Sequence, residues 1–252
     1  MKITRKHFLQ LSGLALIAAG VKKLASSIAD AERSEHRARA TRWGMAIDLQ
    51  KCRQKDGCNR CIKACHSAHN VPQFSDPAHE IKWIWKQRFE DVFPFAQTQY
   101  TRDVFAAAPV LLMCNHCDDP PCEDVCPVGA TWRRDDGVVM MDFHRCIGCR
   151  YCMAACLYGS RSFNWQDPRP ALSQVNPDFP TRTKGVVEKC NFCEERLAKK
   201  LRPLCVEACE EKAFVFGDLE QPDSEIRRTL RSRFALQRRP ELGSGPSVYY
   251  LI

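Results

Sequence analysis

Residues 113–156 read MCNHCDDPPCEDVCPVGATWRRDDGVVMMDFHRCIGCRYCMAAC and hold eight cysteines in two groups of four. The first group has the spacing C-x2-C-x4-C-x3-C and is followed by Pro127. The second group has the spacing C-x2-C-x2-C-x3-C. Two residues between cysteines allow a tight loop to turn several thiolates toward one point, so each group predicts a metal centre.

The second spacing is that of bacterial ferredoxins, in which three cysteines hold one [4Fe-4S] cluster and the fourth reaches a second cluster. Because the fourth ligand comes from the other group, each cluster would join both halves of the stretch. The first expected ligand set is Cys114, Cys117, Cys122 and Cys156. The second expected set is Cys126, Cys146, Cys149 and Cys152.

Zinc and disulfides are the alternatives to iron-sulfur clusters. Zinc favours four ligands in two CxxC pairs with a longer spacer, and a third cysteine two residues further on would have no role. Cysteines this close together also leave little freedom for disulfide geometry. His116 and His144 lie beside the cysteines, but every group is already complete in cysteine, so both are expected to be supporting or surface residues.

The whole chain has 252 residues and sixteen cysteines, which fall into four groups of four. The first group in the chain has the spacing C-x5-C-x2-C-x3-C, with Gly57 available for the turn before its second cysteine. Its members are Cys52, Cys58, Cys61 and Cys65. The last group has the spacing C-x2-C-x11-C-x3-C and consists of Cys190, Cys193, Cys205 and Cys209. Four groups of four predict four [4Fe-4S] clusters.

The formal charge of +8 would suit a nucleic-acid or anionic lipid partner if the polypeptide acted alone. An oxidised [4Fe-4S] cluster with four thiolates carries about two negative charges, so four clusters would contribute roughly −8. The loaded protein is then close to neutral, and no nucleic-acid partner is expected.

Residues 1–31 have the layout of an export signal, with a basic start, an apolar run over residues 8–20 and a small-residue site at residues 29–31. Arg5 lies in a stretch similar to a twin-arginine (Tat) signal, in which Lys6 replaces the second arginine. The apolar run is too short to span a bilayer as a helix, although a retained segment could anchor the protein. Residues 32–44 are charged and aperiodic and predict a linker.

Short strands are expected at residues 45–49 and 138–143, each containing an aspartate and preceding a cysteine loop and a helix. The aromatic stretch from Ile81 to Phe95 fits a packed strand or hairpin, with a docking surface as the alternative. Residues 166–184 predict a surface loop. The remaining expected elements are a helical turn at residues 194–200, a strand at 213–218 and a solvated helix at 227–239.

The cysteine motifs resemble those of the DMSO-reductase-type iron-sulfur subunits, a family of four-cluster ferredoxin-type subunits of membrane-associated redox complexes. The resemblance runs from about Met45 to the end of the chain. It is carried by residues 114–122 (CNHCDDPPC), 145–152 (RCIGCRYC) and 188–193 (EKCNFC). Within the family, the chain is most similar to the exported DsrO-type subunits of a membrane complex in dissimilatory sulfur metabolism.

The resemblance implies that the outer groups are paired as the inner ones are. One further cluster would be held by Cys52, Cys58, Cys61 and Cys209, and another by Cys65, Cys190, Cys193 and Cys205. The implied fold is α+β, with two nested ferredoxin-like modules in residues 45–252. The inner module covers residues 110–165, and the outer one combines 45–109 with 185–252.

The resemblance implies that the protein transfers electrons. The sequence contains no nucleophile-base pair, phosphate loop or dinucleotide motif, so no catalytic activity of its own is expected. By resemblance, the partners are an NrfD-like quinone-interacting membrane subunit and a multihaem cytochrome c or other redox subunit. The protein would lie in the periplasm at the membrane face, held by its partners or by a retained N-terminal segment. The alternative is the iron-sulfur subunit of a molybdopterin oxidoreductase that acts on tetrathionate, polysulfide or thiosulfate.

Overall fold

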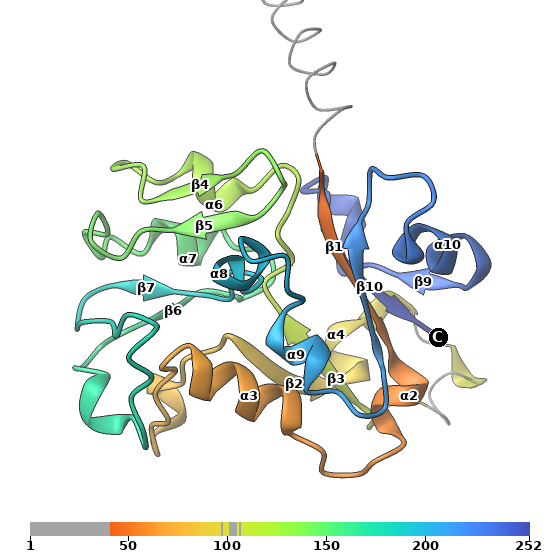
Figure 1. The fold of residues 1–252 in the computed structure, drawn as a ribbon, viewed down its shortest axis with the longest axis horizontal. Helices are drawn as coiled ribbons and strands as arrows, with labels where there is room; N and C mark the ends of the chain where they lie inside the picture. The colour runs from red at the N-terminus through yellow and green to blue at the C-terminus, as the bar shows by residue number, and fades with distance from the viewer. Residues whose placement is uncertain (1–40, 97, 101–104, 106) are drawn as a thin grey trace, which may run out of the picture. The chain divides into compact units, whose positions relative to one another are not determined.

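The computed structural model describes residues 41–252, apart from residues 97, 101–104 and 106. In this part of the chain short helices and strands alternate (Figure 1), so the expected mixed α+β class is confirmed. The predicted export segment and the predicted linker up to residue 40 lie outside the described residues. The first strand begins at Trp43, which is two residues earlier than the sequence predicts.

The first and last strands of the described region pair in one sheet. Its order is β8-β1-β10-β9, with β1 antiparallel to β8 and parallel to β10. The strands are β1 (Trp43–Asp48), β8 (Phe214–Asp218), β9 (Ala235–Leu236) and β10 (Val248–Leu251). Met45 pairs with Val248, so segments from opposite ends of the described region lie side by side.

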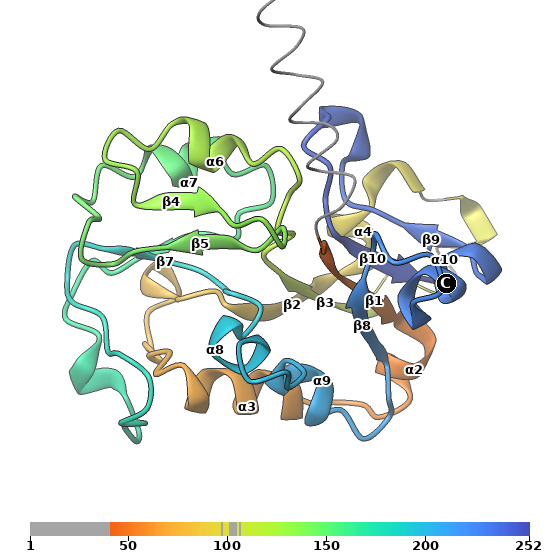
Figure 2. The same ribbon diagram turned by 45° about the horizontal axis from the view of Figure 1, so that its top comes forward.

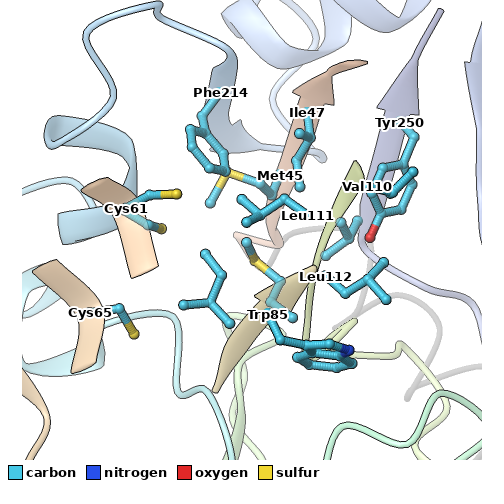
Figure 3. Close-up of a cluster of buried hydrophobic side chains, with 14 of the residues drawn as sticks. Met45, Ile47, Cys61, Cys65, Trp85, Val110, Leu111, Leu112, Phe214 and Tyr250 are labelled. Atoms are coloured by element: carbon cyan, nitrogen blue, oxygen red, sulfur yellow. The ribbon is translucent and has the colours of Figure 1, made fainter. Parts of the chain in front are cut away.

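Both faces of this sheet are covered. One face contributes Met45, Ile47 and Tyr250 to the largest apolar cluster, which also contains Cys61 and Cys65 (Figure 3). The other face packs against α10 (Glu225–Ser232). The sequence places this helix at residues 227–239, but it ends earlier, and β9 and a buried Arg238 follow.

The aromatic stretch after the first cysteine group forms a hairpin. Strand β2 (Ile84–Arg88) pairs antiparallel with β3 (Pro109–Met113), and α4 (Phe89–Val92) follows β2. Trp83, Trp85 and Phe93 are buried, with exposed fractions of 1%, 7% and 5%. These side chains therefore serve packing rather than a docking surface, and Phe95 is the one strongly exposed aromatic side chain of this stretch.

The inner cysteine groups lie in a region with few strands and helices. It contains α6 (Pro121–Asp124), β4 (Thr131–Arg133), β5 (Val139–Met141) and α7 (Tyr151–Ala155). Strands β4 and β5 form a hairpin that packs with α6 and α7 over a small apolar cluster (Figure 2). A second two-stranded pair, β6 (Ser162–Phe163) with β7 (Val187–Glu188), continues toward the last cysteine group.

The remaining elements are short. The helices are α2 (Leu49–Arg53), α3 (Arg60–Ala68), α8 (Glu194–Leu197) and α9 (Leu204–Glu207). The 3-10 turns are η1 (Pro77–His79), η2 (Pro94–Ala96), η3 (Arg169–Ala171) and η4 (Pro240–Leu242). Residues 166–184 form a loop as expected. The side chain of Arg182 in this loop is fully buried and forms an ion pair with Glu188.

Candidate iron-sulfur cluster sites

All sixteen cysteines lie in the described part of the chain, and none of them forms a disulfide. Their thiols gather in four places, and we call the resulting groups sets A to D. Set A is Cys52, Cys58, Cys61 and Cys209, and set B is Cys65, Cys190, Cys193 and Cys205. Set C is Cys114, Cys117, Cys122 and Cys156, and set D is Cys126, Cys146, Cys149 and Cys152.

Set A combines the beginning and the end of the described chain. Cys52 lies on α2 and Cys61 on α3, while Cys209 follows α9, which packs against α3. The four thiols line one hollow, with Lys86 and Phe214 at its wall. Gly57 has a φ of +65° and makes the turn that returns Cys58 to this hollow.

Set B lies beside set A and is the more deeply buried of the two. Its four thiols line a hollow with Trp83, Met113 and Phe192. Burial raises the pKa of the Cys190 thiol to about 12, and the nearby Cys114 of set C adds to the rise. Set B therefore has set A on one side, through Cys61 near Cys205, and set C on the other.

Set C lines a hollow together with Asn115, Tyr158 and Arg161. Both side-chain polar atoms of Asn115 are buried and have no hydrogen-bond partner among the described residues. Burial and, to a lesser extent, the neighbouring cysteines raise the pKa of the Cys117 thiol to about 12. Four convergent thiols supply the ligands that a [4Fe-4S] cluster requires, and the amide of Asn115 would be available as a hydrogen-bond donor to its sulfur atoms.

Set D lies nearest to the surface. Burial raises the pKa of Cys152, the adjacent Arg161 opposes this rise, and Cys146 and Cys149 add to it. Cys126 packs against the same small apolar cluster as Cys152. Cys149 of this set is exposed to solvent.

The last cysteine of three groups is held by the same hydrogen bond. The sulfur accepts from the backbone N–H four residues later, from Ala130 to Cys126 at 3.2 Å, Ser160 to Cys156 at 3.4 Å, and Ala213 to Cys209 at 3.3 Å. In the first group helix α3 continues past Cys65, and the ring of His69 approaches this sulfur at 3.7 Å instead. Such N–H donors stabilise the thiolate form and fix its direction.

An aspartate side chain caps the backbone turn that precedes the cysteine in two of the loops. Asp48 accepts the Lys51 N–H at 3.0 Å and caps α2, which carries Cys52 toward set A. Asp142 accepts the His144 N–H at 2.8 Å, four residues before Cys146. This is the local repeat that the sequence predicts. In both copies the aspartate stands four residues before the cysteine, because its carboxylate caps the turn that leads to the cysteine.

The two histidines beside cysteines have different environments. His116 is fully buried, accepts the Val139 N–H at 3.1 Å and stacks on Phe192 with ring centroids 3.7 Å apart. It therefore packs in the gap between sets B and C and is a supporting residue. The side chain of His144 is 94% exposed, so His144 is a surface residue.

Sequence reasoning missed several residues that contact the cysteine sets. Two of them are His69 and Glu195, whose possible ligand atoms lie within 4.8 Å of each other and of the predicted ligand Cys193, at the edge of set B. Arg161 and Lys189 are buried cations near sets C and D. A basic residue next to a cysteine, as in Lys189-Cys190, is the signal that could have marked one of them.

No helix among the described residues of 41–252 has the length and apolar character that crossing a membrane requires.

Comparisons with known proteins also indicate iron-sulfur clusters. Two models of the 4Fe-4S dicluster domain match residues 108–171 and 145–214. The Hdr-like menaquinol oxidoreductase iron-sulfur subunit 1 of Archaeoglobus fulgidus is 38% identical over 98% of this chain and 97% of its own length. A putative dimethyl sulfoxide reductase iron-sulfur subunit of Halobacterium salinarum is 37% identical over 84% of this chain and 79% of its own length. A tetrathionate reductase subunit of Salmonella typhimurium is 34% identical over 100% of this chain and 89% of its own length.

The cysteine sets and the matched domains define an iron-sulfur protein of the 4Fe-4S dicluster class. The chain belongs to the family of oxidoreductase iron-sulfur subunits that contains these relatives, so the resemblance read from its motifs is confirmed at the level of the family. It is an electron-transfer subunit of a larger oxidoreductase rather than a catalytic enzyme itself.

Proposed function

We propose that the chain holds four [4Fe-4S] clusters, one in each of the sets A to D. The observation that carries this proposal is the convergence of sixteen free thiols in four groups of four. Sets C and D would form the inner of two nested ferredoxin-like modules, in residues 110–165. Sets A and B would form the outer module, in residues 45–109 with 185–252.

The contacts between sets support a linear order A, B, C, D. Cys61 of set A lies near Cys205 of set B, and Cys190 of set B lies near Cys114 of set C. Arg161 donates a hydrogen bond to Cys122 of set C and interacts electrostatically with Cys152 of set D. A bound [4Fe-4S] cluster takes up and gives off one electron at a time, so such an order would carry electrons along the chain.

The proposed role is to pass electrons between a quinone-interacting membrane subunit and an exported redox partner. The relative from Archaeoglobus fulgidus is named as a menaquinol oxidoreductase subunit, which supports a quinone-linked complex. In finer detail we propose a DsrO-type subunit of dissimilatory sulfur or sulfite metabolism, with an NrfD-like membrane subunit and a multihaem cytochrome c as partners. Residues 1–31 would direct it to the periplasmic face of the membrane.

The second candidate is the electron-transfer subunit of a molybdopterin oxidoreductase. It is favoured by the similarity to the tetrathionate reductase subunit, which extends over the whole of this chain. Polysulfide and thiosulfate would be the other substrates of such a complex.

Iron and acid-labile sulfide analysis of anaerobically purified protein tests the cofactor content. Four clusters require about sixteen iron and sixteen sulfide per chain, with EPR signals of [4Fe-4S] clusters after reduction. Zinc without sulfide would contradict the proposal, and about eight of each would limit it to two clusters.

Purification from detergent-solubilised membranes distinguishes the two complexes. An integral membrane subunit and a haem protein that purify with the chain would support the DsrO-type role. A large molybdenum-containing subunit would select the second candidate.

The export signal is tested separately. An Arg5→Ala variant should accumulate in the cytoplasm, and full export of this variant would contradict the assignment of residues 1–31.

A further inference from the structure

Arg161 is a buried cation next to two cysteine sets. It lies between Cys156 and strand β6, and its exposed fraction is 4%. Its Nη2 donates a hydrogen bond to the Cys122 Sγ of set C at 3.1 Å. The guanidinium also lies close enough to Cys152 of set D for the two groups to influence each other's pKa.

The position of the guanidinium is held by a second pair of contacts. Its Nη1 donates to the Thr131 Oγ1 at 3.0 Å and approaches the Met141 Sδ at 3.4 Å. Both residues are buried and belong to the β4–β5 hairpin. The guanidinium of Arg161 is therefore held in place by the hairpin through Nη1, while Nη2 faces the cysteine sulfur of set C.

The charge of Arg161 faces cysteine sulfurs rather than a carboxylate. A buried guanidinium is costly unless an anion pairs with it. Among the described residues no ion pair joins Arg161 to an aspartate or glutamate, while the groups that act on its charge are Cys122, Cys152 and Cys114. Its Nε is buried without a described hydrogen-bond partner and remains available to an acceptor in the cluster hollow.

Other buried cations of this region differ from Arg161. The charge of Arg182 is matched by Glu188 at 2.6 Å, with both side chains fully buried. The amine of Lys189 donates to the backbone carbonyls of Val139 and Cys190 rather than to a sulfur. Arg161 therefore combines a buried positive charge with a hydrogen bond to a sulfur of set C and an electrostatic interaction with Cys152 of set D.

We propose that Arg161 is a shared counter-ion of the clusters in sets C and D and raises the reduction potential of both. The proposal rests on the proposed four-cluster function. Gain of one electron makes a thiolate-ligated cluster more negative by one charge, so a cation at hydrogen-bond distance favours the reduced state. Sets A and B do not contact this guanidinium, and their potentials are expected to depend on it much less.

Potentiometric titration followed by EPR, on the full chain purified anaerobically with its partners, tests this role. Arg161→Met removes the charge and the donors, so the ratio of reduced to oxidised cluster at a fixed potential should fall at least tenfold for two of the four signals. For a one-electron couple this is a potential lower by about 59 mV or more. Arg161→Lys keeps the charge but loses the fork, and a smaller shift of the same two signals is expected.

Arg231→Met is the matched control, because Arg231 is an exposed arginine on α10 and its loss should leave all four potentials unchanged. Unchanged potentials in an Arg161→Met protein with its full iron content would overturn the proposal, as would an equal shift of all four signals. If Arg161→Met fails to bind iron, Arg161→Gln, which removes the charge but keeps a hydrogen-bond donor, decides by the same criterion. Absence of [4Fe-4S] signals from the wild-type protein would instead contradict the proposed function.

Discussion

At the scale of single residues, glycines set the path of the cysteine loops. Gly148 lies between Cys146 and Cys149 with a φ of +69°, which glycine adopts without steric cost. A Cβ at this position would lie 2.4 Å from the Gly185 carbonyl oxygen, so the loop of set D approaches a neighbouring backbone too closely for any side chain. Gly159 has a similar φ of +63° but open space around it.

Gly148→Ala should therefore destabilise the loop of set D by more than the strain of its positive φ alone. Gly159→Ala is the matched control. It should lower the free energy of unfolding by about 1–2 kcal/mol, because alanine is strained in the left-handed conformation but its Cβ meets no close contact there. Gly148→Ala should cost more and also lower the iron content by about four atoms per chain. Iron analysis and thermal unfolding of both variants check this, and equal effects would show that the close approach is unimportant.

Asp48 combines a helix cap with an ion pair. Burial would raise its pKa, but hydrogen bonds from Arg233 and from the Lys51 N–H outweigh this, and its pKa lies below the ordinary value of 3.8. A lowered pKa in the folded state means that the carboxylate stabilises the fold above about pH 4 and loses this contribution as the pH falls further.

Asp48→Ala should lower the unfolding free energy by at least ~1 kcal/mol, since it removes both the cap and the ion pair. Asp48→Asn keeps a capping oxygen and should lose less. Denaturant unfolding between about pH 6 and 8 should give a constant difference between wild type and Asp48→Asn, because Asp48 is ionised throughout this range. A difference that grows with pH would contradict the lowered pKa.

At the scale of elements, the parallel pair β1–β10 closes the outer part of the molecule. Tyr250 of β10 is fully buried and packs edge-to-face on Phe93, with ring centroids 5.2 Å apart. Its hydroxyl is buried and has no hydrogen-bond partner among the described residues. The ring rather than the hydroxyl therefore anchors this strand.

Two substitutions at Tyr250 separate these contributions. Tyr250→Ala should cost about 3–5 kcal/mol, as large-to-small changes of buried aromatic residues do. Tyr250→Phe should be neutral or stabilising, because it removes a polar group that is buried without a partner. Denaturant unfolding measures both, with Tyr151→Ala as the exposed control. A strong loss in Tyr250→Phe would reveal a partner for the hydroxyl.

At the scale of the whole molecule, the inner and outer regions differ in how much apolar core they possess. The cluster beneath β4–β5 has six buried members, and two of these are cysteines: Cys122, Ala130, Val139, Met141, Cys152 and Val187. The cluster beneath the four-stranded sheet is much larger and includes Trp83, Phe89 and Tyr250. Bound iron and sulfide must therefore supply more of the stability in the inner region.

Iron removal by an anaerobic chelator should consequently unfold the inner region first. Amide hydrogen exchange should become fast in residues 121–163, while β1, β8 and β10 retain protection longer. Mass spectrometry of exchanged peptides measures this. Simultaneous loss of protection in both regions would mean that the clusters hold the entire chain together equally.

The sequence by itself determined the chemistry of this protein. Cysteine spacings are properties of a few neighbouring residues, and the geometry of a short loop limits which metal centre it can surround. The strands before Cys52 and Cys146 were predictable for the same reason, since their aspartates act within a few residues.

Only the tertiary structure decided which distant groups meet. It brings Cys209 to Cys52, a pairing that the family resemblance implies but that the cysteine spacings alone do not predict. It also buries the aromatic hairpin around Trp83 and places the guanidinium of Arg161 next to two cysteine sets. It also shortens the basic helix near the C-terminus, because β9 pairs with β10 where the pattern of charges predicted a longer helix. These outcomes depend on long-range packing and on the cost of burying charge, and neither is encoded in local spacing.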